Sequence, residues 1–249
     1  RLEKKLDILS ATCNPLDSKN LTFDCDSYSA DYDFNGDGNN DIALIAEESS
    51  PDNMVVYGFI GFNGGGFDSS WNYPTAGTIN KGVGRWELDE DRIAFGTMDE
   101  TTFSGCKVYL LNTTDGTDWV PPEAVTGSID DLEYVDLDND GNKDVAILAN
   151  TYSDPTHTWT YYCYDHNLNL IIPSGHFSFQ SDTGYSSASC SFDAVDLNND
   201  NLYELIPYYR SLRYIGNPLP VVNYAGVLKW SYTAPGRLVD LDDYDLDGD

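Results

Sequence analysis

Acidic side chains alternate along residues 136–144, and their spacing suits a single hard cation. Oxygen-bearing side chains occupy positions 1, 3, 5 and 9 of this stretch: Asp136, Asp138, Asp140 and Asp144. Gly141 at position 6 allows the sharp turn that wraps such side chains round one ion. Carboxylates this close repel one another unless a metal neutralises them. Because calcium accepts many flexible oxygen ligands and magnesium prefers a strict octahedron, the stretch predicts a calcium loop.

An EF-hand is the obvious alternative, and the sequence argues against it. The EF-hand loop needs a bidentate Glu at its twelfth position and a helix on each side. The residue at that place is Ile147, within an apolar run over residues 145–148 that is typical of a buried strand. We therefore expect a metal loop that leads directly into a β-strand.

The same pattern recurs at intervals of about fifty residues, with copies that start near residues 33, 84, 136, 196 and 245. The first copy is complete and offers four ligands: Asp33, Asn35, Asp37 and Asp41. The fourth offers a similar set: Asp196, Asn198, Asp200 and Glu204. In this fourth copy Asn201 replaces the glycine and Glu replaces the last Asp, so we expect a weaker site.

Two copies depart further from the pattern. The second, near residue 84, has Leu88 at position 5 and Arg92 at position 9, so we expect it to bind no metal. The fifth stops after three acidic positions: Asp245, Asp247 and Asp249. Metal binding is therefore expected in the first, third and fourth copies, with a partial site at the end of the chain.

The segments between the loops carry the periodicity of strands and hairpins. Aromatic and β-branched runs such as residues 55–62, 106–111 and 159–164 alternate with Gly- and Asn-rich turns. About four such strands per repeat predict an all-β, propeller-like array of four-stranded antiparallel blades. We expect residues 1–27 to be a connector, beginning with a short amphipathic helix over residues 1–10. Residues 28–249 are expected to form about four blades and the start of a fifth, as part of a longer array.

The loops, each followed by a strand such as Asp41-Ile-Ala-Leu or Asp144-Val-Ala-Ile, resemble the FG-GAP/VCBS repeats of integrin-α-like β-propellers. The resemblance covers roughly residues 28–249. It implies calcium loops on one rim that join neighbouring strands of a blade. It also implies a ligand from the backbone carbonyl at position 7, contributed by Asn39, Asn142 and Leu202. The chain departs from the family in blade number, because integrin-type propellers have seven blades.

Charge and composition exclude several classes of function. The net charge is −29, which repels nucleic acid and anionic lipid, so neither is expected as a partner. A hydrophobic content of 41% with 13% aromatic residues excludes a disordered chain. No apolar run approaches the length that spans a membrane, so no direct membrane insertion is expected.

Cysteines and glycosylation motifs favour an extracellular or cell-surface location. The five cysteines show no CxxC or zinc spacing, and we expect disulfides between Cys13 and Cys25 and between Cys163 and Cys190. Cys106 is then left over. Sequons at Asn20 and Asn112 predict a secreted glycoprotein.

Three functions follow as hypotheses. The first is a calcium-stabilised, non-enzymatic structural or adhesive module, such as an adhesin or a surface-filament subunit, whose partners are further copies, other cell-surface proteins or glycans. Exposed edge strands would then promote assembly. The second is a polysaccharide-acting enzyme similar to some lyases, with candidate groups His157, His166, His176, Tyr208, Tyr209, Arg210 and Arg213. The third is a lectin that stacks sugars on Trp and Tyr side chains. Motifs of metalloproteases, serine hydrolases and P-loops do not occur in the sequence.

Overall fold

The computed structural model shows an all-β protein. It describes residues 4–9, 15–21, 24–29, 33–38, 40–49, 52–62, 67–74, 83–88, 91–97, 105–153, 156–171, 177–182, 190–209 and 218–233. These residues form eighteen strands and contain no helix. Among them, accordingly, nothing helical is long and apolar enough to cross a membrane. The all-β prediction is confirmed.

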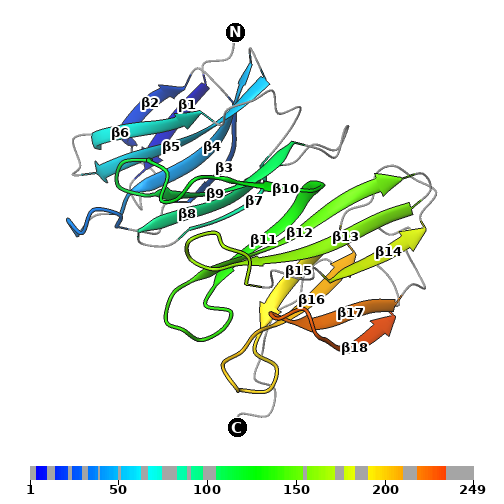
Figure 1. The fold of residues 1–249 in the computed structure, drawn as a ribbon. Helices are drawn as coiled ribbons and strands as arrows, with labels where there is room; N and C mark the ends of the chain where they lie inside the picture. The colour runs from blue at the N-terminus through cyan, green and yellow to red at the C-terminus, as the bar shows by residue number, and fades with distance from the viewer. Residues whose placement is uncertain are drawn as a thin grey trace. The chain divides into compact units, whose positions relative to one another are not determined.

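The strands form four antiparallel sheets of four strands each and one hairpin (Figure 1). The first sheet comprises β3 (Asp24–Ser29), β4 (Ile42–Ser49), β5 (Asp52–Phe62) and β6 (Phe67–Pro74). The second comprises β7 (Val83–Leu88), β8 (Arg92–Thr97), β9 (Cys106–Asn112) and β10 (Glu123–Val125). The third comprises β11 (Ser128–Val135), β12 (Asp144–Ser153), β13 (Thr156–Tyr164) and β14 (Ser178–Asp182). The fourth comprises β15 (Cys190–Val195), β16 (Glu204–Tyr209), β17 (Pro218–Asn223) and β18 (Leu228–Thr233).

In every sheet the spatial order follows the order along the chain, so each strand pairs with its neighbours in sequence. The repeat of about fifty residues therefore corresponds to one four-stranded meander. The first sheet begins at Asp24, slightly before the predicted start of the repeats at residue 28.

The N-terminal segment is a β-hairpin, and the predicted helix over residues 1–10 is wrong. Strand β1 (Lys4–Leu9) pairs antiparallel with β2 (Pro15–Leu21). Leu6 and Ile8 alternate with charged residues, which is the period of a strand rather than of a helix. The alternation is only a few residues long, so the sequence alone did not separate the two patterns.

The chain divides into two compact units. The larger unit contains the third and fourth sheets, which share a core of aromatic and aliphatic side chains. Trp159 and Phe192 are fully buried in this core, and the ring of Tyr161 meets Phe192 edge-on at 5.4 Å. Strand β12 is buried on both faces over its first seven residues, which explains its continuous apolar run over residues 145–149. The core thus holds the start of β12 in a fixed position.

The other unit contains the first sheet, and Trp71 of β6 is a key packing residue there. Its indole nitrogen donates a hydrogen bond of 2.7 Å to the carbonyl oxygen of Thr113. Its ring lies directly against the backbone at Gly58 and at Gly116, where a Cβ atom would come within 2.2 Å. Only glycine leaves room for the ring at these two places.

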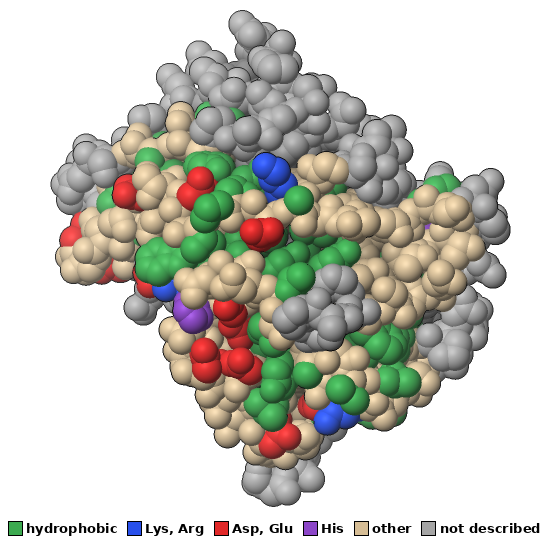
Figure 2. All heavy atoms as spheres, in the orientation of Figure 1, with side chains coloured by type: hydrophobic (Ala, Val, Ile, Leu, Met, Phe, Trp, Pro, Cys, Tyr) green, Lys and Arg blue, Asp and Glu red, His purple; other side chains and the backbone are tan. Residues whose placement is uncertain are grey.

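Acidic side chains dominate the charged surface. On the face shown in Figure 2, carboxylates occur in several separate groups among the described residues, whereas Lys and Arg side chains are few. This distribution agrees with the strongly negative net charge.

Candidate calcium loops

The three complete loops occupy equivalent places in their sheets. Each joins the first strand of a four-stranded sheet to the second: β3 to β4, β11 to β12, and β15 to β16. The ninth residue of each loop stands at or next to the first residue of the second strand: Asp41, Asp144 and Glu204. The strands therefore fix both ends of every loop.

The first residue of each loop organises the backbone round its carboxylate. Asp136 Oδ1 accepts a hydrogen bond from the backbone N–H of Asp140 at 3.0 Å, and its Oδ2 accepts one from Gly141 at 2.9 Å. The loop that starts at Asp33 repeats these bonds, and so does the loop that starts at Asp196. Because the bonds are local, each nine-residue stretch specifies its own fold.

Two positions in each loop adopt a left-handed conformation. At position 6 the φ angles are 88° for Gly38, 92° for Gly141 and 61° for Asn201. Position 4 has the same property in all three loops, at Gly36, Asn139 and Asn199. Glycine and asparagine tolerate this region best, which explains why Asn201 can replace the glycine. The recurrent Gly or Asn at position 4 is a signal of this loop in the sequence that the spacing of the ligands alone does not include.

The ninth residue closes each loop with one of its two carboxylate oxygens. Asp144 Oδ2 accepts a hydrogen bond from the backbone N–H of Leu137 at 3.1 Å, and Asp41 Oδ2 accepts one from Phe34 at 2.7 Å. Both carboxylates are buried. The ninth residue thus holds the backbone of the second loop residue close to the start of the following strand.

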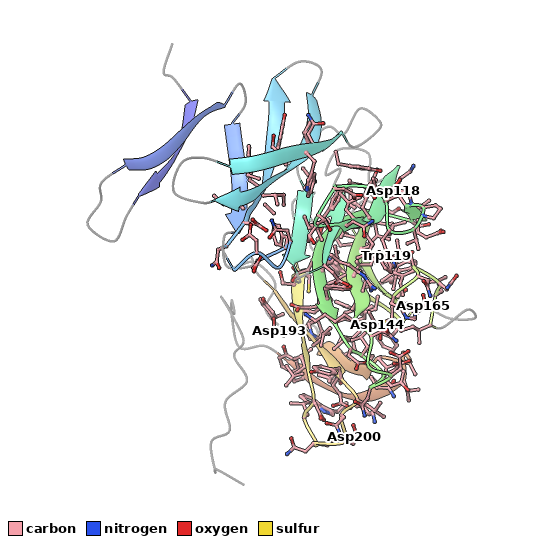
Figure 3. The ribbon with its side chains drawn as sticks, turned by 90° about the vertical axis from the view of Figure 1, so that its left-hand side faces the viewer. Asp118, Trp119, Asp144, Asp165, Asp193 and Asp200 are labelled. Atoms are coloured by element: carbon pink, nitrogen blue, oxygen red, sulfur yellow. The ribbon has the colours of Figure 1, made fainter. Side chains whose placement is uncertain are left out.

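The third loop brings its acidic groups together. Carboxylate oxygens of Asp136, Asp138 and Asp144 all lie within 4.8 Å of one another. Burial, and then repulsion from Asp138, Asp140 and Asp136, raises the pKa of Asp144 to about 7. Figure 3 labels Asp144 where its strand begins. Negative charge is thus concentrated where a cation would relieve the repulsion.

The donor set suits a hard cation, of which calcium is one. It consists of hard oxygens from several carboxylates on a short loop, with no sulfur or imidazole ligand among Asp136–Asp144. Asp136, Asp138, Asp140 and Asp144 would hold the ion, together with the carbonyl of Asn142. The ion would cross-link the two ends of the loop and neutralise part of its charge.

The other two loops share the scaffold but not the convergence. Among the described residues, the Asp136 loop is the only one in which three carboxylates approach this closely. The first loop has Asn35 at position 3, which leaves fewer carboxylates, and its Asn39 lies outside the described residues. In the fourth loop Asp200 lies at the exposed tip (Figure 3), and Glu204 is buried at the base.

The second copy is not a loop of this kind. Leu88 and the residues before it belong to β7, so only residues 89–91 connect β7 to β8. Arg92 takes the place of the ninth ligand, and its guanidinium lies 3.9 Å from the ring centre of Trp119. A positively charged side chain at a ligand position repels calcium and cannot coordinate it. The fifth copy, Asp245, Asp247 and Asp249, lies outside the described residues.

The predicted disulfide between Cys163 and Cys190 is absent, and that prediction is wrong. Both thiols are free and buried. The two cysteines lie on β13 and β15, in different sheets, and Cys190 Sγ donates to the carbonyl oxygen of Tyr208 at 3.2 Å. Burial raises the pKa of Cys163 to about 12 and that of Cys190 well above its usual value, so both remain thiols. Cys106 is likewise free and buried, and Cys13 lies outside the described residues.

The described part of the chain does not bring the candidate catalytic residues into one site. His157 is buried near the start of β13 and bonds to Asn150 at 2.9 Å, whereas His166 lies in the turn beyond the end of that strand. The length of the strand separates them by roughly 20 Å. Tyr208 is buried in β16. Of the other candidates, His176, Arg210 and Arg213 lie outside the described residues, as does the side chain of Tyr209.

The sequon at Asn112 lies at the end of β9, where its side chain is already engaged. Asn112 Nδ2 donates to Thr117 Oγ1 at 3.0 Å. A glycan at this nitrogen requires that bond to break. Asn20 lies in β2, and its side chain is outside the described part of the structure.

Neither a comparison with models of known protein families nor a comparison with curated proteins gives a match for this chain. The resemblance to FG-GAP/VCBS repeats therefore depends on the loops and the strands that follow them.

Proposed function

We propose that the chain is a calcium-stabilised, non-enzymatic structural or adhesive module of the cell surface or extracellular space, built as a propeller-like array of FG-GAP/VCBS type. The convergence of Asp136, Asp138 and Asp144 within 4.8 Å carries the proposal. The equivalent place of the loops in three of the four sheets supports it, because the same metal would then clamp the first hairpin of each of these three repeats.

The calcium affinity expected of such loops supports the proposed location. Open loops in extracellular modules bind calcium with dissociation constants of about 10⁻⁴–10⁻³ M. Sites of this strength fill in extracellular fluid and remain empty at the far lower calcium levels of a cytosol. Calcium would therefore stabilise the protein outside the cell and not in the cytosol.

A polysaccharide-acting enzyme and a lectin remain the alternative proposals, with less support. His157 is occupied by a buried hydrogen bond, and the stacked pair His157 and Trp159 belongs to the core rather than to a sugar-binding surface. Trp119 and Trp230 are the Trp side chains most exposed among the described residues, and a lectin would use these.

The test is to count bound calcium and to measure its effect on thermal unfolding. With about 2 mM calcium and a dissociation constant of about 0.1 mM, mass action stabilises the protein by about 1.8 kcal/mol per site. We expect the purified chain to bind two to three calcium ions per molecule, and excess chelator to lower the melting temperature by at least about 5 °C. An unchanged melting temperature together with no bound calcium would refute the proposal.

A further inference from the structure

The fourth loop differs from the other two in how its ninth residue is used. Glu204 Oε2 accepts a hydrogen bond from the backbone N–H of Leu197 at 3.3 Å, as the ninth residues of the other loops do with their own second residues. Its other oxygen, Oε1, lies 3.8 Å from the Nζ atom of Lys229. The oxygen that would face a metal therefore faces an ammonium group.

Lys229 reaches this carboxylate from another part of the sheet. It lies on β18, and Glu204 begins β16, so strand β17 lies between them. The side chain of Lys229 is 40% exposed and that of Glu204 is 5% exposed. A partly exposed ammonium group thus lies near a buried carboxylate.

The longer side chain at position 9 makes this contact possible. Glu has one methylene group more than the Asp found at this position in the first and third loops. Among the described residues, no basic side chain forms an ion pair with Asp144, the equivalent residue of the third loop. The longer Glu side chain and the Lys229 ammonium group are therefore both needed for this ion pair.

The rest of the fourth loop is also less firmly held. Its second residue, Leu197, is 49% exposed, whereas the equivalent residues are 7% exposed at Phe34 and 0% exposed at Leu137. The side chains of Phe34 and Leu137 anchor their loops in the core, and Leu197 does not. The carboxylates of Asp196, Asp200 and Glu204 do not converge as those of the third loop do.

We propose that the Lys229 ammonium is a built-in competitor of calcium at the Asp196–Glu204 loop. Building on the calcium function proposed above, this inference assigns a regulatory residue to one of its sites. Calcium must displace the ammonium from Glu204 Oε1 before it can use that oxygen, and the two positive charges repel each other. The fourth loop consequently fills at a higher calcium concentration than the first and third loops, so successive repeats stiffen at different concentrations.

The test removes the ammonium and measures calcium binding at this loop alone. The background protein carries Asp37→Ala and Asp138→Ala, which disable the first and third loops. Isothermal titration then compares the background with the same protein carrying Lys229→Met, which keeps the apolar stem of the side chain. We expect Lys229→Met to tighten calcium binding about fivefold, which corresponds to about 1 kcal/mol.

Three controls separate competition from general effects. Lys107→Met removes the same charge from β9 and should leave the affinity unchanged, whereas Lys229→Arg should retain weak binding. Glu204→Asp, which draws the carboxylate back from Lys229, should tighten binding. If the background variant is unstable, equilibrium dialysis of the otherwise unaltered chain near 0.1 mM calcium should show more bound ions with Lys229→Met than without it.

The outcomes distinguish this inference from the proposed function. If the unaltered chain binds calcium but Lys229→Met and Glu204→Asp leave the affinity of the fourth loop unchanged, the competitor role is wrong and the calcium function stands. If Lys107→Met tightens binding as much as Lys229→Met, the effect comes from net charge and the competitor role is again wrong. If the unaltered chain binds no calcium, both proposals are wrong.

Discussion

At the scale of single residues, the third loop makes a direct prediction about Asp138. Its carboxylate belongs to the converging group, so Asp138→Ala should remove one calcium ion per molecule and lower the melting temperature in calcium by a few degrees. Differential scanning calorimetry in calcium and in chelator measures this effect. The variant should melt closer to the unaltered protein once chelator is present, because the missing ligand then has no ion to bind.

Asp91→Ala is the matched control for Asp138→Ala. Asp91 is an exposed aspartate in the short connection before β8, where no calcium loop forms. The Asp91→Ala substitution should change neither the number of bound calcium ions nor the difference between the melting temperatures in calcium and in chelator. Equal losses of calcium-dependent stability in the two variants would show that the Asp138 loop is not a metal site.

A second prediction concerns Asp130, which is half-buried near the start of the third sheet. Burial raises its pKa to about 7, although Trp159 Nε1 donates to its Oδ2 at 3.0 Å and Asn150 donates at 3.3 Å. The folded state thus keeps a proton that the unfolded state loses near pH 4. The stabilisation is complete at low pH and is lost as the pH rises toward 7.

Asp130→Asn should remove this pH dependence, because an amide keeps an acceptor oxygen and does not titrate. Urea unfolding in saturating calcium should show the stability of the unaltered protein falling between pH 5 and pH 7 by about 2 kcal/mol more than that of the variant. Saturating calcium keeps Asp144 ionised and so removes its contribution. Parallel pH profiles would contradict the assignment.

Single residues also show why the loops were predictable and Lys229 was not. The ligand positions follow from nine consecutive residues that bind one another, so their spacing in the sequence is their spacing in space. Lys229 approaches Glu204 across the intervening strand β17, and the register that brings the two side chains together cannot be read from the sequence. The disulfide prediction failed for the same reason, since Cys163 and Cys190 were paired by their order in the chain rather than by position.

At the scale of elements, the contact between Trp71 and two glycines gives a third prediction. Gly116 has a φ angle of 69°, and a Cβ atom there would come within 2.2 Å of Trp71 Cε3. Gly116→Ala therefore combines backbone strain with overpacking against an aromatic ring. We expect it to lower the free energy of unfolding by about 2–4 kcal/mol, as measured by urea denaturation.

Gly105→Ala separates the two causes. Gly105 has a similar φ angle of 75° but nothing within 4 Å of an added Cβ atom. The Gly105→Ala substitution should lower the free energy of unfolding only through backbone strain, by about 1 kcal/mol. Equal losses at Gly105 and Gly116 would mean that the Trp71 ring moves aside without cost.

The strands themselves were largely predictable, because period-two alternation and Gly-rich turns are local signals. Strand β13 shows this plainly: Thr156, Thr158 and Thr160 lie on its more exposed face, and His157 and Trp159 are buried. The first hairpin was mistaken for a connector with a helix because its alternation is short. The packing of Trp71 against Gly116 could not be predicted for another reason: it joins a strand of the first sheet to the connection between β9 and β10 of the second.

At the scale of the whole molecule, the net charge of −29 gives the fourth prediction. Without calcium, the clustered carboxylates repel one another and destabilise the compact state. Salt screens this repulsion, since the Debye length falls from about 10 Å at 0.1 M to about 3 Å at 1 M. The melting temperature in chelator should therefore rise with sodium chloride more than the melting temperature in saturating calcium does. The gap between the two should shrink by about half or more at 1 M salt. Sucrose is uncharged and should leave the difference between the two melting temperatures unaltered. If sodium chloride also leaves this difference unaltered, calcium stabilises the protein only by cross-linking the loops.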